Sequence, residues 1–116
     1  MAVVVRGRRK FYAYPRWGRC QCCGQYGELT AHHVVTEQTI RRYDRSRVYD
    51  LDNRLLVGWY CCHYRHHNPG VKDTRIDFDR VPERARRFAV ELMGEDRASS
   101  YFARRYRVNQ EENHAG

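Results

Sequence analysis

Two pairs of histidines have spacings that could serve a metal centre. His63 and His67 are four residues apart, so on a helix both side chains project from one face and can bind one ion. His32 and His33 are adjacent in a strand-like segment, where successive side chains point to opposite sides. One of them could face the ion while the other faces a water molecule. Three imidazoles on a metal and a fourth that accepts a proton would favour metal-assisted hydrolysis, because imidazole titrates near neutral pH.

The cysteines predict a second, structural metal site. The five cysteines cannot all pair within one chain, and four of them stand in the doublets Cys22-Cys23 and Cys61-Cys62. Adjacent cysteines make poor disulfide frameworks but recur in the metal sites of reducing compartments, which predicts a cytoplasmic protein. A structural ion would also help a chain of 116 residues, which has room for one domain with a modest core.

The charge of the chain predicts a polyanionic partner, for which nucleic acid is the commonest candidate. The formal net charge is +8, from 22 basic and 14 acidic residues. All but two of the basic residues are arginine, whose planar guanidinium pairs with two phosphate oxygens at once. A GC-rich genome would produce part of the same bias. No apolar run is long enough to span a membrane, and residues 2–5 are too short for the core of a signal peptide.

Short strands and helices are predicted to position these residues. Residues 28–35 alternate like a strand that carries His32 and His33, and residues 55–57 predict a second strand. Residues 61–67 predict a helix that Asn68-Pro69-Gly70 ends. Two further helices are predicted, one from Pro82 to Gly94 and one capped by Asp96, and their apolar faces indicate packing.

Three segments in this order resemble the His-Asn-His (HNH) endonucleases, in the cysteine-containing branch common in bacteriophages and bacteria. The segments are residues 29–35 (LTAHHVV), 49–56 (YDLDNRLL) and 62–68 (CHYRHHN). The resemblance covers residues 20–70 and implies a ββα-metal fold, in which a hairpin and a following helix bind one divalent cation. Residues 81–107 also resemble the helical extension of such proteins, less specifically.

The resemblance implies a role for each site residue. By it, His32 is a metal ligand and His33 is the general base, while Asn53 fixes the hairpin loop and orients the base. His63 and His67 would complete a site for Mg²⁺, Mn²⁺, Ni²⁺ or Zn²⁺. The implied reaction is hydrolysis of DNA phosphodiester bonds to a 5′-phosphate and a 3′-hydroxyl. The role of His66 stays open between phosphate contact, metal ligation and exposure to solvent.

The cysteine pattern departs from that branch at the start of the helix. The branch usually carries Cys-x-x-Cys-His there, but in this chain the position of the first of these two cysteines is occupied by Trp59. We predict that Cys20, Cys23, Cys61 and Cys62 bind structural zinc, with Cys22 in place of Cys61 as the alternative. Adjacent helical residues point about a quarter-turn apart, so joint ligation needs an irregular first turn. The spacing from Asn53 to His63 is also one residue longer than usual, which fits a bulge there.

The predicted fold class is α+β, with a small ββα-metal core, a zinc knuckle and a helical C-terminal extension. The predicted units are a basic aromatic N-terminal arm (1–19), the nuclease core (20–70), the helical extension (71–108) and a disordered tail (109–116). The aromatic side chains of the arm could stack on nucleic acid or pack on the domain.

DNA is the predicted partner. The candidate phosphate contacts are Arg41, Arg42, Arg45, Arg47 and Arg65, although each could equally be solvated surface. One alternative is a non-catalytic, zinc-stabilised DNA-binding module, which would leave both histidine pairs without a role. Another is an accessory subunit that cleaves only with the packaging or recombination proteins of a bacteriophage.

Overall fold

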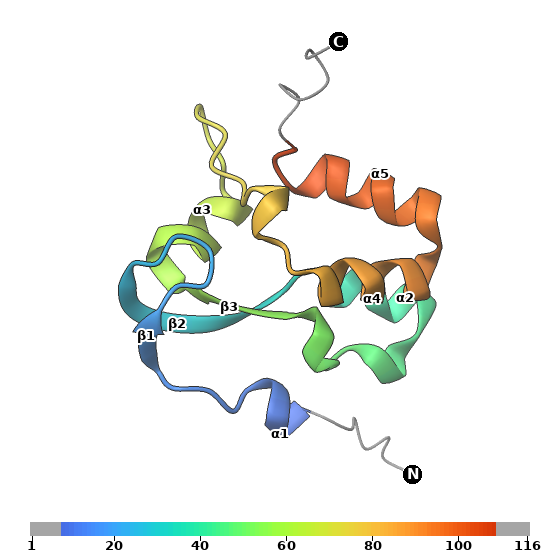
Figure 1. The fold of residues 1–116 in the computed structure, drawn as a ribbon, viewed down its shortest axis with the longest axis horizontal. Coiled ribbons are helices and arrows are strands. Elements are labelled where there is room, and N and C mark those ends of the chain that lie inside the picture. The colour runs from blue at the N-terminus through green and yellow to red at the C-terminus, as the bar shows by residue number, and fades with distance from the viewer. Residues whose placement is uncertain (1–7, 109–116) are drawn as a thin grey trace.

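A three-stranded antiparallel sheet organises the computed structural model, which describes residues 8–108 (Figure 1). The strands lie in the order β1 (Trp17–Arg19), β2 (Tyr26–His33) and β3 (Arg54–Gly58). The helices are α1 (Arg8–Phe11), α2 (Glu37–Tyr43), a π-helical turn (Trp59–His63) that continues into α3 (Tyr64–His67), α4 (Glu83–Met93) and α5 (Glu95–Arg105). Short 3₁₀ turns cover Arg45–Arg47, Leu51–Asn53 and Phe78–Arg80. The predicted α+β class is therefore confirmed.

The sheet register brings the ends of β1 and β3 together. β2 pairs with β1 on one side and with β3 on the other, where His32 lies opposite Leu55 and His33 opposite Arg54. Because β1 and β3 both run antiparallel to β2, their last residues lie at the same end of the sheet. The loop after β1 and the helical turn after β3 therefore begin close together, and these two segments carry all five cysteines.

Residues 8–19 of the predicted N-terminal arm pack against the rest of the protein. The Phe11 side chain is fully buried, and the Arg54 guanidinium donates hydrogen bonds to the carbonyl oxygens of Lys10 and Phe11 at 2.9 and 3.0 Å. Tyr12 and Trp17 remain about half exposed. Phe11 therefore packs on the domain, whereas Tyr12 and Trp17 keep aromatic surface that is exposed to solvent. The rest of the arm, residues 1–7, and the predicted disordered tail lie outside the described residues.

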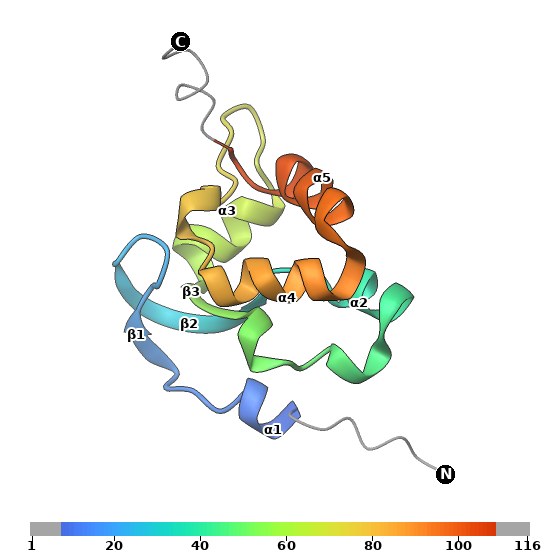
Figure 2. The same cartoon turned by 45° about the vertical axis from the view of Figure 1, so that its right-hand side comes forward.

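The two C-terminal helices form an antiparallel pair that turns at Gly94, where φ is +88°. Their buried residues include Phe88 on α4 and Phe102 on α5, as the apolar spacing predicted. In Figure 2, α4 runs across the molecule with α5 above it and α2 beside it. The cap of α5 is Gly94, so Asp96 lies inside the first turn and does not cap the helix. Among the described helices, none is both long and apolar enough to cross a bilayer.

Asn53 ties the end of β2 to the turn before β3. Its side chain is fully buried, Oδ1 accepts the Val35 N–H at 2.7 Å, and Nδ2 donates to the Val35 carbonyl at 2.9 Å. The Asn53 carbonyl accepts the Val34 N–H at 2.9 Å. Asn53 thereby holds the chain that follows His33 in one conformation.

We expect Asn53→Ala to destabilise the fold. Both polar backbone groups of Val35 would lose their partner, at a cost of roughly 1–3 kcal/mol for each buried group. Urea unfolding would measure this. Asn68→Ala is the matched control, because the Asn68 amide donates only to an exposed carbonyl, that of Tyr64. Equal stability of the two variants would contradict the structural role of Asn53.

Candidate metal centres

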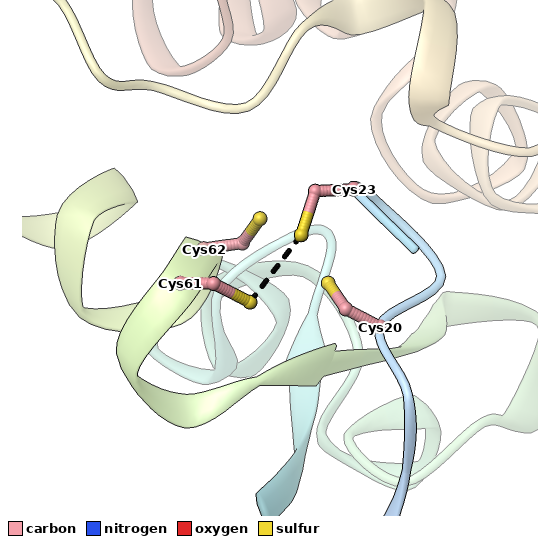
Figure 3. A group of neighbouring side chains, drawn as sticks. All are labelled: Cys20, Cys23, Cys61 and Cys62. Carbon is pink, nitrogen blue, oxygen red and sulfur yellow. Dashed lines mark hydrogen bonds between the residues drawn. The ribbon is translucent and has the colours of Figure 1, made fainter. Parts of the chain in front are cut away.

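Four cysteines from two separate segments converge, and their sulfur atoms point toward one another in Figure 3. The loop after β1 carries Cys20 and Cys23, and the π-helical turn carries Cys61 and Cys62. The four Sγ atoms all lie within 4.8 Å of one another, with those of Cys23 and Cys61 at 3.4 Å. Around a tetrahedral zinc with Zn–S bonds of about 2.3 Å, sulfur atoms are about 3.8 Å apart. The cluster could therefore hold a metal ion such as zinc.

The π-helical turn supplies the irregular geometry that adjacent cysteine ligands require. Its closing hydrogen bond runs from the Tyr64 N–H to the Trp59 carbonyl, five residues earlier. A π turn accommodates one residue more than an α-helical turn, which matches the bulge expected from the spacing between Asn53 and His63. Gly58 lies directly before the turn, and a Cβ atom at this position would overlap Cys61 Sγ. Glycine is therefore required where β3 meets the cluster.

The environment of the cluster affects its thiols unequally. Burial raises the pKa of Cys61 to about 11 and also raises the pKa of Cys62. Burial opposes ionisation of Cys20 as well, but hydrogen bonds from the backbone of Gly58, Cys23 and Cys22 lower the Cys20 pKa to about 7. Four thiolates at this separation would repel one another, and a bound cation would offset that repulsion.

Cys22, the alternative ligand, lies beside the four converging cysteines. Its backbone N–H donates to Cys20 Sγ at 3.4 Å, and its half-buried side chain has a pKa that burial raises. The set whose sulfur atoms come together consists of the other four. The structure therefore favours Cys61 over Cys22 as a ligand.

Three histidines form a second cluster beside α3. One ring nitrogen from each of His32, His63 and His67 lies within 4.8 Å of the other two. His32 projects from β2 and is buried, whereas His63 is half-buried and His67 is exposed. The ring centroids of His63 and His67 are 4.7 Å apart, as expected for side chains four residues apart on one helical face. The cluster could hold a divalent cation with one side open to solvent.

Tyr106, a site residue that the sequence patterns did not predict, fixes the protonation of His32. Its hydroxyl donates to the Val34 carbonyl at 2.7 Å and lies 2.7 Å from His32 Nε2. Since the hydroxyl proton is used on Val34, His32 Nε2 must carry a proton and donate it to the tyrosine oxygen.

The other nitrogen of His32 is consequently an acceptor. His32 Nδ1 is buried and has no hydrogen-bond partner among the described residues. Burial lowers the pKa of His32, so the ring is neutral at physiological pH. A neutral imidazole with a free lone pair on one nitrogen and a hydrogen bond on the other is typical of a metal ligand.

His33 lies on the opposite face of β2 from His32 and has a different environment. Its ring stacks on Phe11, with centroids 4.4 Å apart, and its Nε2 atom is buried without a partner among residues 8–108. Burial lowers the His33 pKa, while the Glu37 carboxylate and a backbone hydrogen bond with Val48 raise it. In the tautomer that protonates Nδ1, Nε2 carries the lone pair and can accept a proton.

His66 has a structural contact. Its side chain is buried, and its Nδ1 accepts the Ile76 N–H at 2.9 Å, which ties α3 to the segment before α4. Burial lowers the His66 pKa to about 4. His66 is thus not exposed to solvent, and it is not one of the three histidines whose ring nitrogens converge.

The five arginines predicted to contact phosphate have different surroundings. Arg41 pairs with Glu37 at 2.7 Å. Arg47 pairs with Asp50 and Glu91, and its guanidinium lies over the Phe88 ring. It therefore joins the 3₁₀ turn Arg45–Arg47 to α4. The other three, Arg42, Arg45 and Arg65, are exposed and form no ion pair within residues 8–108.

Comparisons of this chain with family models, curated proteins and solved structures found no match.

We expect Tyr106→Phe to weaken divalent-cation binding at the histidine cluster about 10- to 100-fold, the usual effect of removing a hydrogen bond to a ligand histidine. Titration of the zinc-loaded protein with Ni²⁺ or Mn²⁺ measures the affinity. Tyr101→Phe is the control, because its buried hydroxyl accepts the Thr36 N–H at 2.9 Å and does not contact His32. Equal metal affinity in both variants would show that Tyr106 has only a packing role.

Proposed function

We propose that this protein is a metal-dependent endonuclease of the HNH type that hydrolyses phosphodiester bonds in DNA. The observation that carries the proposal is a pair of buried imidazole nitrogens on consecutive residues, His32 Nδ1 and His33 Nε2, without partners in the described part of the chain. An unpartnered buried acceptor is costly, so two in succession point to ligands that the protein itself does not supply. His63 and His67 lie beside the first of them and provide two further metal ligands.

Each residue has a distinct role in this proposal. His32, His63 and His67 would hold one divalent cation, either Mg²⁺, Mn²⁺, Ni²⁺ or Zn²⁺. The bound cation would withdraw charge from a non-bridging phosphate oxygen and from the leaving 3′-oxygen. His33 Nε2, which is buried without a partner among the described residues, would accept a proton from the attacking water. Asn53 keeps the chain after His33 in place through Val35.

The cysteine cluster has a structural role in the same proposal. It would bind zinc and cross-link the loop after β1 to the turn that carries His63. A domain of this size gains stability from such a cross-link. The net charge of +8 favours DNA as the substrate over a neutral or cationic one.

The position of Phe11 sets a requirement for catalysis. Phe11 stacks on His33, and His33 Nε2 is buried. This atom has to meet water during the reaction, so Phe11 and α1 have to move away from His33 when the substrate binds. The same observation favours one alternative, a nuclease that acts only when a partner protein, such as a phage packaging or recombination protein, displaces this segment.

His67→Ala tests the proposal against a non-catalytic DNA-binding module. The variant loses one cation ligand while the cysteine cluster stays intact. We expect cleavage to require a higher concentration of divalent cation and to reach a lower maximum rate. DNA affinity without divalent cation should barely change. Tyr64→Ala, an exposed change on the same helix, should keep the wild-type cation requirement. The module predicts no cleavage by any of these proteins and no second metal site on titration.

A further inference from the structure

A hollow of about 790 Å³ lies between α2 and α5, and its lining includes none of the residues of the two candidate metal centres. Four of its lining residues are arginines, namely Arg42, Arg97, Arg104 and Arg105. The lining also includes the hydroxyl side chains of Thr39 and Ser100, and Asp96 is its one acidic residue. We call this feature the α2–α5 groove.

The arginines of the α2–α5 groove are gathered by helical spacing. Arg97, Arg104 and Arg105 are seven and eight residues apart on α5, which places them on one face of that helix. Tyr101 lies on the same face, with the Arg105 guanidinium 5.7 Å from its ring centroid. Arg42 is in the last turn of α2 and faces them across the hollow.

These four side chains are available to a ligand. All four are exposed, and none forms an ion pair within the part of the chain that the structure describes. Other arginines of the chain, such as Arg47, Arg75 and Arg107, are paired with carboxylates. Four guanidinium groups around one hollow with a single carboxylate repel one another, and an anion would relieve that repulsion.

The α2–α5 groove adjoins the histidine cluster at the end of α5. Arg105 directly precedes Tyr106, whose hydroxyl lies 2.7 Å from His32 Nε2. The C-terminal end of α5 is also near α3 in both Figures 1 and 2. An extended polyanion that lies along α5 would therefore point toward the histidine cluster.

We propose that the α2–α5 groove binds the sugar-phosphate backbone of duplex DNA beside the bond that is cleaved. The choice of DNA as the polyanion rests on the proposed nuclease function. Arginine forks would pair with phosphate oxygens, and the Thr39 and Ser100 hydroxyls could donate to neighbouring ones. These interactions position the backbone without reading its sequence, so they predict affinity without base preference.

The test is binding of a short fluorescent DNA duplex without added divalent cation, over a salt range of about 50–200 mM. We expect the double variant Arg97→Gln and Arg104→Gln to bind roughly tenfold to a hundredfold more weakly. The slope of the salt dependence should also fall by about 0.9 for each phosphate that the protein no longer neutralises. The matched control is Arg84→Gln and Arg87→Gln on α4, which removes the same charge from exposed residues outside the groove.

Either of two results would contradict the proposed role of the groove in DNA binding. One is wild-type affinity and slope in the double variant, and the other is an equal reduction of affinity in the α4 control. Cleavage is not the readout, so the groove and the nuclease function can fail separately. If the wild type never cleaves DNA but the groove variant binds DNA more weakly, the result would support DNA binding by the groove and contradict the proposed nuclease function.

Discussion

His33→Ala is expected to reduce metal-dependent cleavage of plasmid DNA by about a hundredfold to ten-thousandfold, the usual range for loss of a general base. His33 Nε2 is buried without a hydrogen-bond partner among the described residues, and its partner in the proposed reaction is the attacking water. The change leaves His32, His63 and His67 in place, so divalent-cation binding should persist. DNA affinity should persist too, because it depends on the pairing of arginine with phosphate.

The measurement is the initial rate of plasmid nicking at saturating divalent cation, corrected for the folded fraction from thermal unfolding. The correction is needed because His33 packs on Phe11, and removing the ring leaves a gap there. His33→Gln fills more of that gap and should be equally inactive. His66→Gln is the control, since it also removes a buried imidazole, whose Nδ1 accepts the Ile76 N–H; cation affinity is measured for this variant as well, because its ring lies 5.1 Å from that of His32. A nicking rate like that of the wild type in His33→Ala would exclude His33 from the mechanism.

Loss of metal from the cysteine cluster is expected to unfold the protein. Structural zinc contributes about 10–16 kcal/mol of binding energy in zinc-finger peptides, which is comparable with the total stability of about 5–15 kcal/mol typical of a domain. Purified protein should contain about one tightly held zinc per chain, and Cys20→Ser should lower both the zinc content and the melting temperature sharply.

Cys22→Ser is the control for the cysteine cluster. Cys22 lies outside the four converging sulfur atoms, so this variant should keep its zinc. Elemental analysis and thermal unfolding measure both quantities. A zinc-free protein that melts cooperatively at the same temperature would contradict a structural role for the cluster. Loss of zinc from Cys22→Ser but not from Cys61→Ser would assign the fourth ligand to Cys22.

The orientation of the histidines within each pair follows from local periodicities that are visible in the sequence. Residues four apart share a helical face, which aligns His63 with His67, and alternation along a strand separates His32 from His33. The predicted strand at 28–35 is found at 26–33 and ends earlier, because Val34 and Val35 direct their backbone hydrogen bonds to Asn53. Short-range patterns thus predicted the elements but not their ends.

Interactions between distant segments were not predictable in the same way. Tyr106 binds His32 across 74 residues, and nothing in the residues around it indicates that interaction. Phe11 covers His33 for a similar reason, because an aromatic residue in a basic segment gives no sign of where its ring packs. Arg47 illustrates the reverse case, since its positive charge suggested a phosphate contact but its guanidinium packs on Phe88.

The cysteine cluster lies between these extremes. Adjacent Cys61 and Cys62 required an irregular turn, and the long spacing from Asn53 to His63 predicted a bulge there. The π-helical form of the turn and the need for Gly58 were not predictable, because they depend on how closely β3 approaches Cys61. Packing of this kind is decided by atoms from two segments and leaves no pattern within either one.

Nicking of supercoiled plasmid by the wild-type protein alone tests the catalytic claim most directly. The reaction is run with and without added Mg²⁺, Mn²⁺ or Ni²⁺, and the zinc content is checked to ensure that the cysteine cluster is intact. We predict conversion to nicked and linear forms with at least one of these ions, none without added ion, and products that carry a 5′-phosphate. Absence of cleavage with every ion, on supercoiled, linear and single-stranded DNA alike, would contradict autonomous catalysis.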